Sequence, residues 1–114
     1  MMNKVYLGID IGGTAAKFGL VDEDGNILYR DEFSVSFDGY ETPILKTVLE
    51  KTEYFVASGG LSFKDISGIG VSATGQIDSV NGEVIGSAGH IKNWVGSKIK
   101  ESFEKRYSIK TVVI

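Results

Sequence analysis

Cysteine is absent from this sequence, and histidine and proline occur once each. A disulfide scaffold and a cysteine-rich zinc site are therefore excluded within these 114 residues. The lack of cysteine fits a reducing compartment, so we expect a cytoplasmic protein. No apolar run approaches the ~18 residues of a membrane span. The first residues, MMNKVYLGIDIGG, are broken by aspartate and glycine too early for a signal-peptide core.

An excess of charge of one sign is also lacking. The formal net charge is -3, and acidic and basic residues are interleaved along the chain. Nucleic-acid binding usually demands a basic stripe, so we expect no nucleic-acid partner. Hydrophobic residues make up 42% of the chain, an ordinary value for a globular protein, and the length suits one domain.

Hydrophobic periodicity predicts five main strands and two helices. Alternating apolar residues indicate strands, and apolar residues spaced by three and four indicate helices. Thr42 is expected to cap the first helix, with Pro43 at its first position and Ser58-Gly59-Gly60 at its end. The expected strands are 5–11, 16–20, 27–36, 66–73 and 111–114; a hairpin is expected at 76–87, and the second helix at 95–107.

The order of these elements predicts an α/β fold. The first three strands should form a meander, whereas strands joined through helices favour parallel pairing with right-handed crossovers. We therefore expect the first, fourth and fifth main strands to be parallel, with the second and third antiparallel to them. The result is a mixed five-stranded sheet with flanking helices. Because the chain ends on a bare strand, we expect a domain truncated after strand five.

The first motif is the string GIDIGGTAAK at residues 8–17. It is not a P-loop, because Thr14 follows the second glycine where a P-loop has lysine. It is not a Rossmann fingerprint either, because GxGxxG is absent and no helix follows. The string instead predicts a glycine turn between two antiparallel strands.

Such a turn suits a phosphate group. Adjacent Gly12 and Gly13 permit positive φ and a close approach of backbone N–H groups to an anion. Thr14 adds a hydroxyl and Lys17 a positive charge, while Asp10 points at the same space. A carboxylate beside phosphates makes sense when Mg²⁺ or its water lies between them. The alternative is a plain hairpin with a glycine turn.

The string D-x-G-G-T-x-x-K resembles the phosphate motif of the ROK family (repressors, open reading frames and kinases) in the actin, hexokinase and Hsp70 superfamily. The resemblance implies a ribonuclease-H-like, actin-like ATPase fold and an ATP-dependent sugar kinase that transfers the γ-phosphoryl group to a hexose hydroxyl. It also implies ATP and Mg²⁺ as cofactors. Asp10, Gly12, Gly13, Thr14 and Lys17 would hold the phosphates, with Asp10 reaching Mg²⁺ indirectly through water.

A second motif, GIGVSATGQID at residues 68–78, resembles the family segment G-I-x-x-P-G-x-V-D that lines the sugar pocket. Thr74 stands where many members have proline. Ligands in open α/β sheets gather at the carboxyl ends of strands, where this motif lies. Gly75 and Gln76 are therefore the expected sugar-binding residues, and the alternative is a strand followed by an ordinary turn.

A third motif, SAGHIKNW at residues 87–94, resembles the family stretch N-L-P-G-W. His90 occupies the place of an asparagine in many relatives. A neutral imidazole both donates and accepts hydrogen bonds, so His90 is a candidate sugar ligand. The alternative is a surface histidine in a loop. Trp94 is expected to anchor the core rather than bind a ligand.

The resemblance covers the whole chain but well under half of a ROK kinase, so residues 1–114 are expected to form the N-terminal phosphate- and sugar-binding lobe. It places the catalytic aspartate, in an E-N-D-x-N segment, beyond Ile114. No catalytic residue is therefore expected in this chain. The family's zinc-binding cluster and adenosine-binding glycines would also lie beyond it.

Two alternatives to a kinase stay open. A sugar-sensing ROK regulator would carry a DNA-binding domain before the glycine turn, but only seven residues precede Gly8. An actin- or Hsp70-like ATP switch fits the second and third motifs less well. The expected partner is a small-molecule sugar, with no membrane. The sequence fixes neither the sugar nor the oligomeric state, and a homodimer of the full-length protein is one option.

Overall fold

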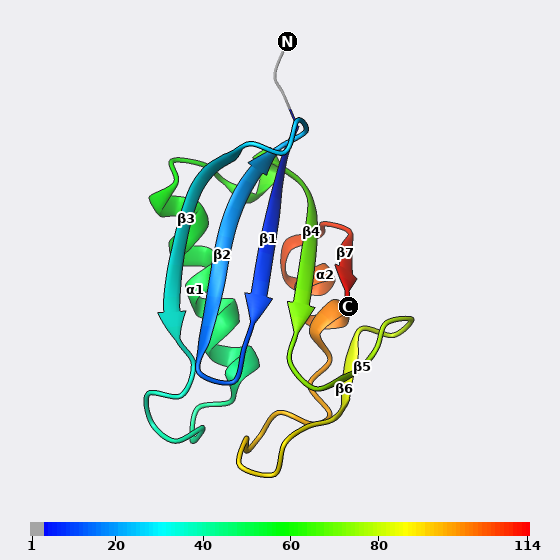
Figure 1. Ribbon diagram of the computed structural model, residues 1–114. Coiled ribbons are helices and arrows are strands. Elements are labelled where there is room, and N and C mark those ends of the chain that lie inside the picture. Colours follow the sequence, from blue (N-terminus) through cyan, green and yellow to red (C-terminus); the bar gives the residue numbers. More distant parts are fainter. Residues whose placement is uncertain (1–3) are drawn as a thin grey trace.

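The computed structural model describes residues 4–114. A five-stranded sheet has the order β3-β2-β1-β4-β7, and β5 and β6 form a separate two-stranded hairpin (Figure 1). The elements in chain order are β1 (Val5–Ile11), β2 (Ala15–Asp22), β3 (Ile27–Ser34), α1 (Ile44–Ser58), the 3-10 helix η1 (Phe63–Asp65), β4 (Ile66–Ala73), β5 (Gln76–Asp78), β6 (Glu83–Gly86), α2 (Ile99–Tyr107) and β7 (Thr111–Val113).

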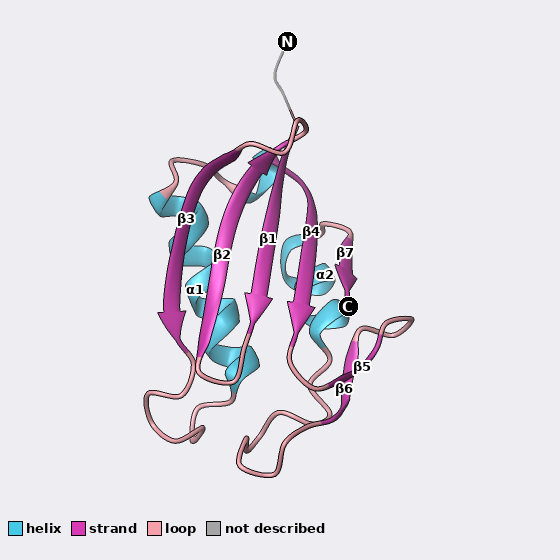
Figure 2. Ribbon diagram, viewed as in Figure 1, coloured by secondary structure: helices cyan, strands magenta, loops and turns pink. Residues whose placement is uncertain are grey.

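The pairing confirms a mixed α/β sheet. β1 is parallel to β4, and β4 is parallel to β7, while β2 is antiparallel to both β1 and β3. The expectation that β3 runs opposite to β1 is wrong. In a meander each strand reverses the previous one, so β3 runs in the same direction as β1 and only β2 is reversed, as the arrows of Figure 2 show.

Both helices lie behind the sheet in the view of Figure 1. Alternate residues of the central strands face them, because successive side chains on a strand point to opposite faces. Phe18 of β2 packs against Phe55 of α1, with ring centroids 5.4 Å apart. The buried residues of β1, β2 and β4 are Leu7, Ile9, Ile11, Ala16, Phe18, Leu20, Ile66, Ile69 and Val71. All of them except Ile66 belong to the alternation that indicated the strands.

The predicted helix starts need correction. Pro43 is the N-cap of α1 rather than its first helical residue, and no side chain caps this helix. The Thr42 hydroxyl instead donates to Asp38 Oδ2 at 2.6 Å. The second helix begins at Ile99, four residues after the exposed Val95. Trp94 is fully buried, which confirms it as a core anchor.

Two smaller features also differ from the prediction. β3 ends at Ser34 rather than at residue 36, because Val35 leaves the strand with its side chain buried in the core. The short helix η1 was not predicted; its capping box uses Ser62 and Asp65. No helix within residues 4–114 is both long and apolar enough to cross a bilayer.

Candidate functional site

The three motifs meet at one end of the sheet. β1 and β4 end side by side, since Ile11 pairs with Ala73 and the Thr74 N–H donates to the Ile11 carbonyl at 2.8 Å. The turn between β1 and β2 and the turn after β4 are therefore neighbours. The hairpin of β5 and β6 and the loop before α2 lie at the same end of the molecule in Figure 1.

The glycine turn, residues 12–14, is closed by a hydrogen bond from the Gly12 N–H to the Ala15 carbonyl at 2.9 Å. Neither Gly12 nor Gly13 has a positive φ, so that expectation is wrong. Glycine is needed here for space. A Cβ on Gly12 would lie 3.1 Å from the Ala15 carbonyl oxygen, and one on Gly13 would lie 3.0 Å from Ile91 Cδ1.

The glycine turn has backbone N–H groups that can donate hydrogen bonds to an anion. Within residues 4–114, the N–H groups of Gly13 and Thr14 make no backbone hydrogen bond, and the Thr14 side chain is exposed. Unpaired backbone N–H groups at a turn form a concave anion-binding site. The turn therefore fits a phosphate group.

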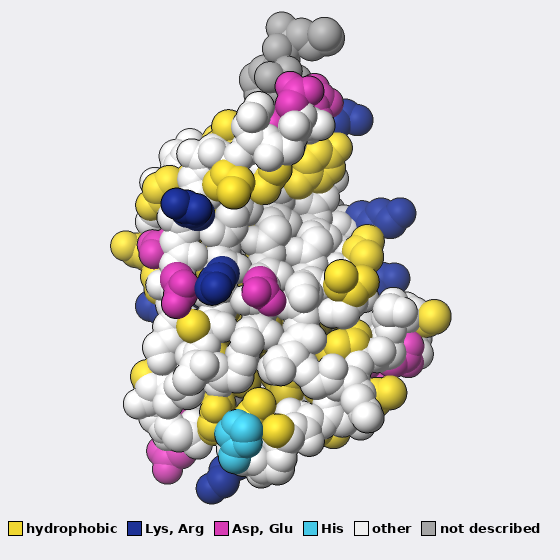
Figure 3. Space-filling model, viewed as in Figure 1, with side chains coloured by type: hydrophobic (Ala, Val, Ile, Leu, Met, Phe, Trp, Pro, Cys, Tyr) yellow, Lys and Arg dark blue, Asp and Glu magenta, His cyan; other side chains and the backbone are white. Residues whose placement is uncertain are grey.

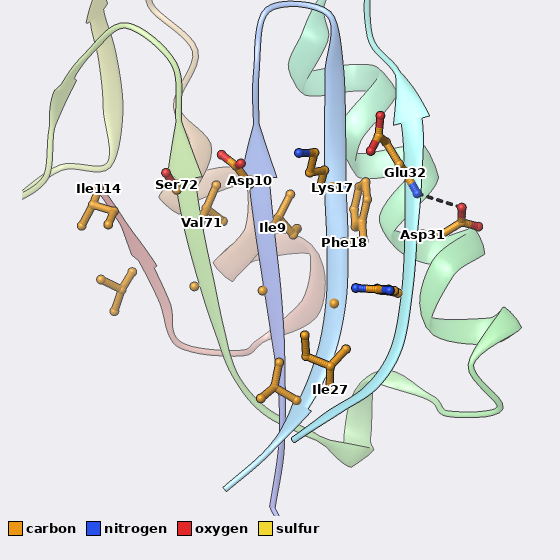
Figure 4. A pocket seen from close by; sticks show the side chains of 16 residues that line it. Ile9, Asp10, Lys17, Phe18, Ile27, Asp31, Glu32, Val71, Ser72 and Ile114 are labelled. Carbon is orange, nitrogen blue, oxygen red and sulfur yellow. Dashed lines mark hydrogen bonds between the residues drawn. The ribbon is translucent and has the colours of Figure 1, made fainter. Parts of the chain in front are cut away.

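Asp10 and Lys17 pair across β1 and β2, and Asp10 also pairs with Ser72 of β4. Figure 4 shows these three side chains side by side on one face of the sheet. Asp10 and Lys17 are exposed, and neither forms an ion pair with a described residue. Both charges are therefore free to meet a ligand beside the glycine turn.

Asp10 also fits a magnesium ion that arrives with phosphates. Residues 4–114 contain no cluster of three or more His, Cys, Asp or Glu side chains that would hold a metal by themselves. Mg²⁺ usually keeps several waters and binds one or two carboxylates together with substrate phosphate oxygens. A single exposed carboxylate next to a turn that fits an anion meets that requirement.

The second motif bends sharply after β4. Gly75 has a φ of +102°, and a Cβ there would lie 2.5 Å from the Gly86 carbonyl oxygen. Gln76 pairs with Gly86 in the β5–β6 hairpin, and its side chain lies against that glycine. Ser87, the residue after Gly86, has a buried hydroxyl with no hydrogen-bond partner in the described chain. A polar atom of this kind can bond a ligand or water.

The hairpin beyond Gln76 is fixed by Asp78. Its carboxylate accepts hydrogen bonds from the Asn81 side chain at 2.8 Å and from the N–H groups of Val80 and Asn81. These bonds, the Asn81 side chain first, lower the pKa of Asp78 below its ordinary value. The hairpin therefore stays closed around Asn81-Gly82, as the sequence predicted.

The third motif forms a loop against the other two. Trp94 Nε1 donates to the Thr74 carbonyl at 3.0 Å, and the Ile91 side chain contacts Gly13. His90 itself is exposed, and the single histidine is visible on the surface at the lower end of Figure 3. The structure thus places His90 in the loop that touches the glycine turn.

A separate hollow of about 880 Å³ lies on the sheet face opposite α1 and α2. Its floor is a row of three neighbouring glycines, Gly19, Gly8 and Gly70. Asp10 and Lys17 lie at its edge, but the other predicted site residues do not line it. The hollow therefore adjoins the candidate site without being the same place.

Sequence reasoning missed Tyr40 and Asn93. Tyr40 donates from its hydroxyl to the Gly13 carbonyl, and Asn93 donates from its amide to the Tyr40 carbonyl. The partners are 27 and 53 residues apart. No local pattern announces contacts at such separations, so only the fold reveals them.

The sheet order and the glycine turn at its end define the N-terminal lobe of an actin-like ATPase fold. The chain matches the ROK family model over residues 6–114 and belongs to that family. It is 26% identical over 100 residues to a glucokinase of Thermotoga maritima, a match that covers 88% of this chain and 30% of that protein.

Two solved structures with the same fold belong to different classes of protein, a kinase and a regulator. A ROK family glucokinase from Streptomyces griseus, in complex with glucose and AMPPNP, is 27% identical with a TM-score of 0.74 over 96% of this chain and 32% of that one. A ROK family transcriptional regulator, a homologue of the E. coli MLC protein, has a TM-score of 0.79 at 15% identity, over 98% and 28% of the two chains, and shows the fold alone. The chain spans about a third of the length of the curated relatives it matches.

Proposed function

We propose that residues 1–114 form the phosphate- and sugar-binding lobe of an ATP-dependent hexose kinase, acting on glucose or an N-acetylmannosamine-like sugar. The observation that carries this proposal is the convergence of three loops at one end of the sheet. The glycine turn contacts Ile91 of the loop that holds His90, and Trp94 of that loop bonds to Thr74 beside Gly75. A phosphate site and a sugar site would thus be neighbours, as phosphoryl transfer requires.

The glycine turn would hold the phosphates of ATP, which supplies the γ-phosphoryl group. The Gly13 and Thr14 N–H groups and the Lys17 ammonium would neutralise phosphate oxygens. Asp10 would hold Mg²⁺ through water. These roles consist of positioning and charge stabilisation, which account for most of the catalysis of phosphoryl transfer.

The sugar would lie against Gly75, Gln76 and His90, with the unpartnered Ser87 hydroxyl close by. The general base that accepts the sugar hydroxyl proton is not among the residues assigned here. By family resemblance it would belong to a C-terminal lobe. A second lobe would also close over the site and exclude water.

A regulator is the second candidate, because a ROK family regulator shares the fold. A sensor of sugar has no need for N–H groups that bind phosphate, whereas the N–H groups of Gly13 and Thr14 make no backbone hydrogen bond. Asp10 and Lys17 likewise form no ion pair with a described residue. This favours the kinase. A cytoplasmic location and a small-molecule sugar partner belong to the same proposal.

The proposal is tested by sugar-dependent ADP release from the complete protein, with glucose and N-acetylmannosamine supplied separately. Asp10→Ala should reduce turnover by about a hundredfold or more, without a change in melting temperature, because Asp10 is exposed and outside the core. Asp24→Ala is the matched control, since Asp24 is also an exposed aspartate and lies in the β2–β3 turn, away from the glycine turn. Turnover that survives Asp10→Ala would remove Asp10 and its proposed magnesium ion from the mechanism.

A further inference from the structure

Tyr40 joins two of the loops at the candidate site. Its hydroxyl donates to the Gly13 carbonyl at 2.6 Å, and its own carbonyl accepts a hydrogen bond from Asn93 Nδ2 at 2.8 Å. Two hydrogen bonds through one residue thus connect the loop that carries His90 to the glycine turn. The first bond is part-buried and the second is exposed, so the first is screened less by water.

The backbone at both partners is unusual. Tyr40 has a φ of +67° and Asn93 a φ of +58°. Left-handed backbone is disfavoured for a bulky residue such as tyrosine, and it persists where the surrounding structure fixes it. Among residues 4–114, the third such non-glycine residue is Ser108, which merely ends α2. The two non-glycine residues with left-handed backbone at the site are therefore bonded to each other.

The hydrogen bond to the Gly13 carbonyl affects the next N–H group, that of Thr14, which is proposed to donate to phosphate. The Gly13 carbonyl and the Thr14 N–H belong to one peptide group, which is planar and trans. Holding the carbonyl oxygen toward Tyr40 therefore aims the Thr14 N–H in the opposite direction. Within the described chain that N–H makes no backbone hydrogen bond of its own, and the bond from Tyr40 holds the other end of its peptide group.

The loop at the other end of this path is anchored at the sugar side. Ile91 contacts Gly13, and Trp94 bonds to the Thr74 carbonyl next to Gly75. Asn93 lies between these two anchors. A ligand that contacts His90 would therefore act on the same short segment, residues 90–94, whose Asn93 bonds to Tyr40.

We propose that Tyr40 and Asn93 are positioning residues that couple the sugar loop to the phosphate turn, so that a bound sugar fixes the Thr14 N–H for nucleotide binding. This inference rests on the proposed function. Coupling of this kind is reciprocal, so sugar and nucleotide each raise the affinity of the other by the same factor.

The test measures the dissociation constant of AMPPNP for the complete protein, with and without saturating glucose, in wild type, Tyr40→Phe and Tyr107→Phe. Tyr107 is the matched control, because its hydroxyl donates to a backbone carbonyl too, that of Leu49 at 3.2 Å, away from the site. We expect Tyr40→Phe to reduce the glucose-dependent gain in affinity by about two- to tenfold, the range for one neutral hydrogen bond. Tyr107→Phe should leave the gain unchanged. An equal gain in Tyr40→Phe and wild type would overturn the proposal.

Asn93→Gly supplies an independent variant. Glycine keeps the left-handed backbone and removes the amide donor. It should lower the gain in the same direction as Tyr40→Phe, and the double variant should lose less than the sum of the two, because both act along one path. Additive losses would mean that the two residues act separately, contrary to the proposal.

Failure of the proposed function has a different signature. A wild-type protein that binds no AMPPNP would refute the kinase proposal, whereas one that binds AMPPNP equally with and without glucose or N-acetylmannosamine would overturn the coupling. The positioning role is then decided by amide hydrogen exchange at Thr14. Faster exchange in Tyr40→Phe than in wild type and Tyr107→Phe would uphold it, and equal exchange in all three would overturn it.

Discussion

Replacement of Gly75 by alanine tests whether the turn after β4 has the shape on which the sugar site depends. Two features oppose a side chain there. The φ of +102° suits glycine, and a Cβ would lie 2.5 Å from the Gly86 carbonyl oxygen. Since that oxygen belongs to the backbone of β6, the hairpin itself would have to shift.

Two other glycines separate these effects. Gly25 has a φ of +86° but open space around its Cβ position, so Gly25→Ala carries the backbone strain alone. Gly70, in the middle of β4, has neither a positive φ nor a neighbour within 4 Å. Left-handed backbone costs alanine about 1–2 kcal/mol, and overpacking adds about 1–3 kcal/mol. The expected losses are therefore about 2–5 kcal/mol for Gly75→Ala and about 1–2 kcal/mol for Gly25→Ala.

Thermal unfolding followed by circular dichroism measures the difference. One kcal/mol corresponds to about 4–8 °C in a domain of about 100 residues, so Gly25→Ala should melt about 4–16 °C below wild type and Gly75→Ala clearly lower still. Gly70→Ala should melt at or slightly above wild type, because alanine restricts the unfolded chain. The reasoning is refuted if Gly75→Ala melts no lower than Gly25→Ala, since the close approach of β6 would then be absent.

Three further predictions follow from the same geometry. His90→Asn should change the ratio of kcat/KM between glucose and N-acetylmannosamine more than it changes KM for ATP, by about fivefold or more for one hydrogen bond to the sugar; an unmoved ratio in steady-state kinetics would make His90 a simple loop residue. Asn81→Ala should raise the pKa of Asp78 toward its ordinary value, because the Asn81 side chain is the main cause of its lowering. The stability that these hydrogen bonds contribute is present above the unfolded-state pKa and is lost as the pH falls through the folded-state pKa. NMR titration of the Asp78 carboxyl group in both proteins measures the change in pKa. The 114-residue chain alone should fold by circular dichroism yet release no ADP with any hexose, and sugar-dependent release from it would show that the chain carries its own base.

Much of the sheet could be predicted because its signals are local. Alternation of apolar residues located the strands, and the buried residues of β1, β2 and β4 other than Ile66 belong to the alternating set. The direction of each strand was harder to predict. The direction of β3 depends on the reversal of successive strands in a meander and not on the residues of β3 themselves. The start of α2 was misplaced because Val95 continues the four-residue spacing while it lies exposed in the preceding loop.

The candidate site was predictable in part for the same reason. Asp10, Gly12, Gly13, Thr14 and Lys17 lie within one hairpin, so their proximity follows from the turn itself. The reason for the glycines was not predictable. Gly13 is crowded by Ile91, which lies far along the chain, and its backbone has no positive φ.

The sequence by itself determined the ROK-like motifs, the strand and helix pattern and the residues proposed for phosphate binding, because each depends on neighbours within a few positions. The tertiary structure alone decided that the sugar loop touches the glycine turn, that Tyr40 bridges Gly13 and Asn93, and that Trp94 ties its loop to Thr74. These contacts join segments 20 to 53 residues apart, and their geometry depends on the parallel register of β1 and β4. Register is set by the packing of the buried faces against the helices, which no single stretch of sequence contains.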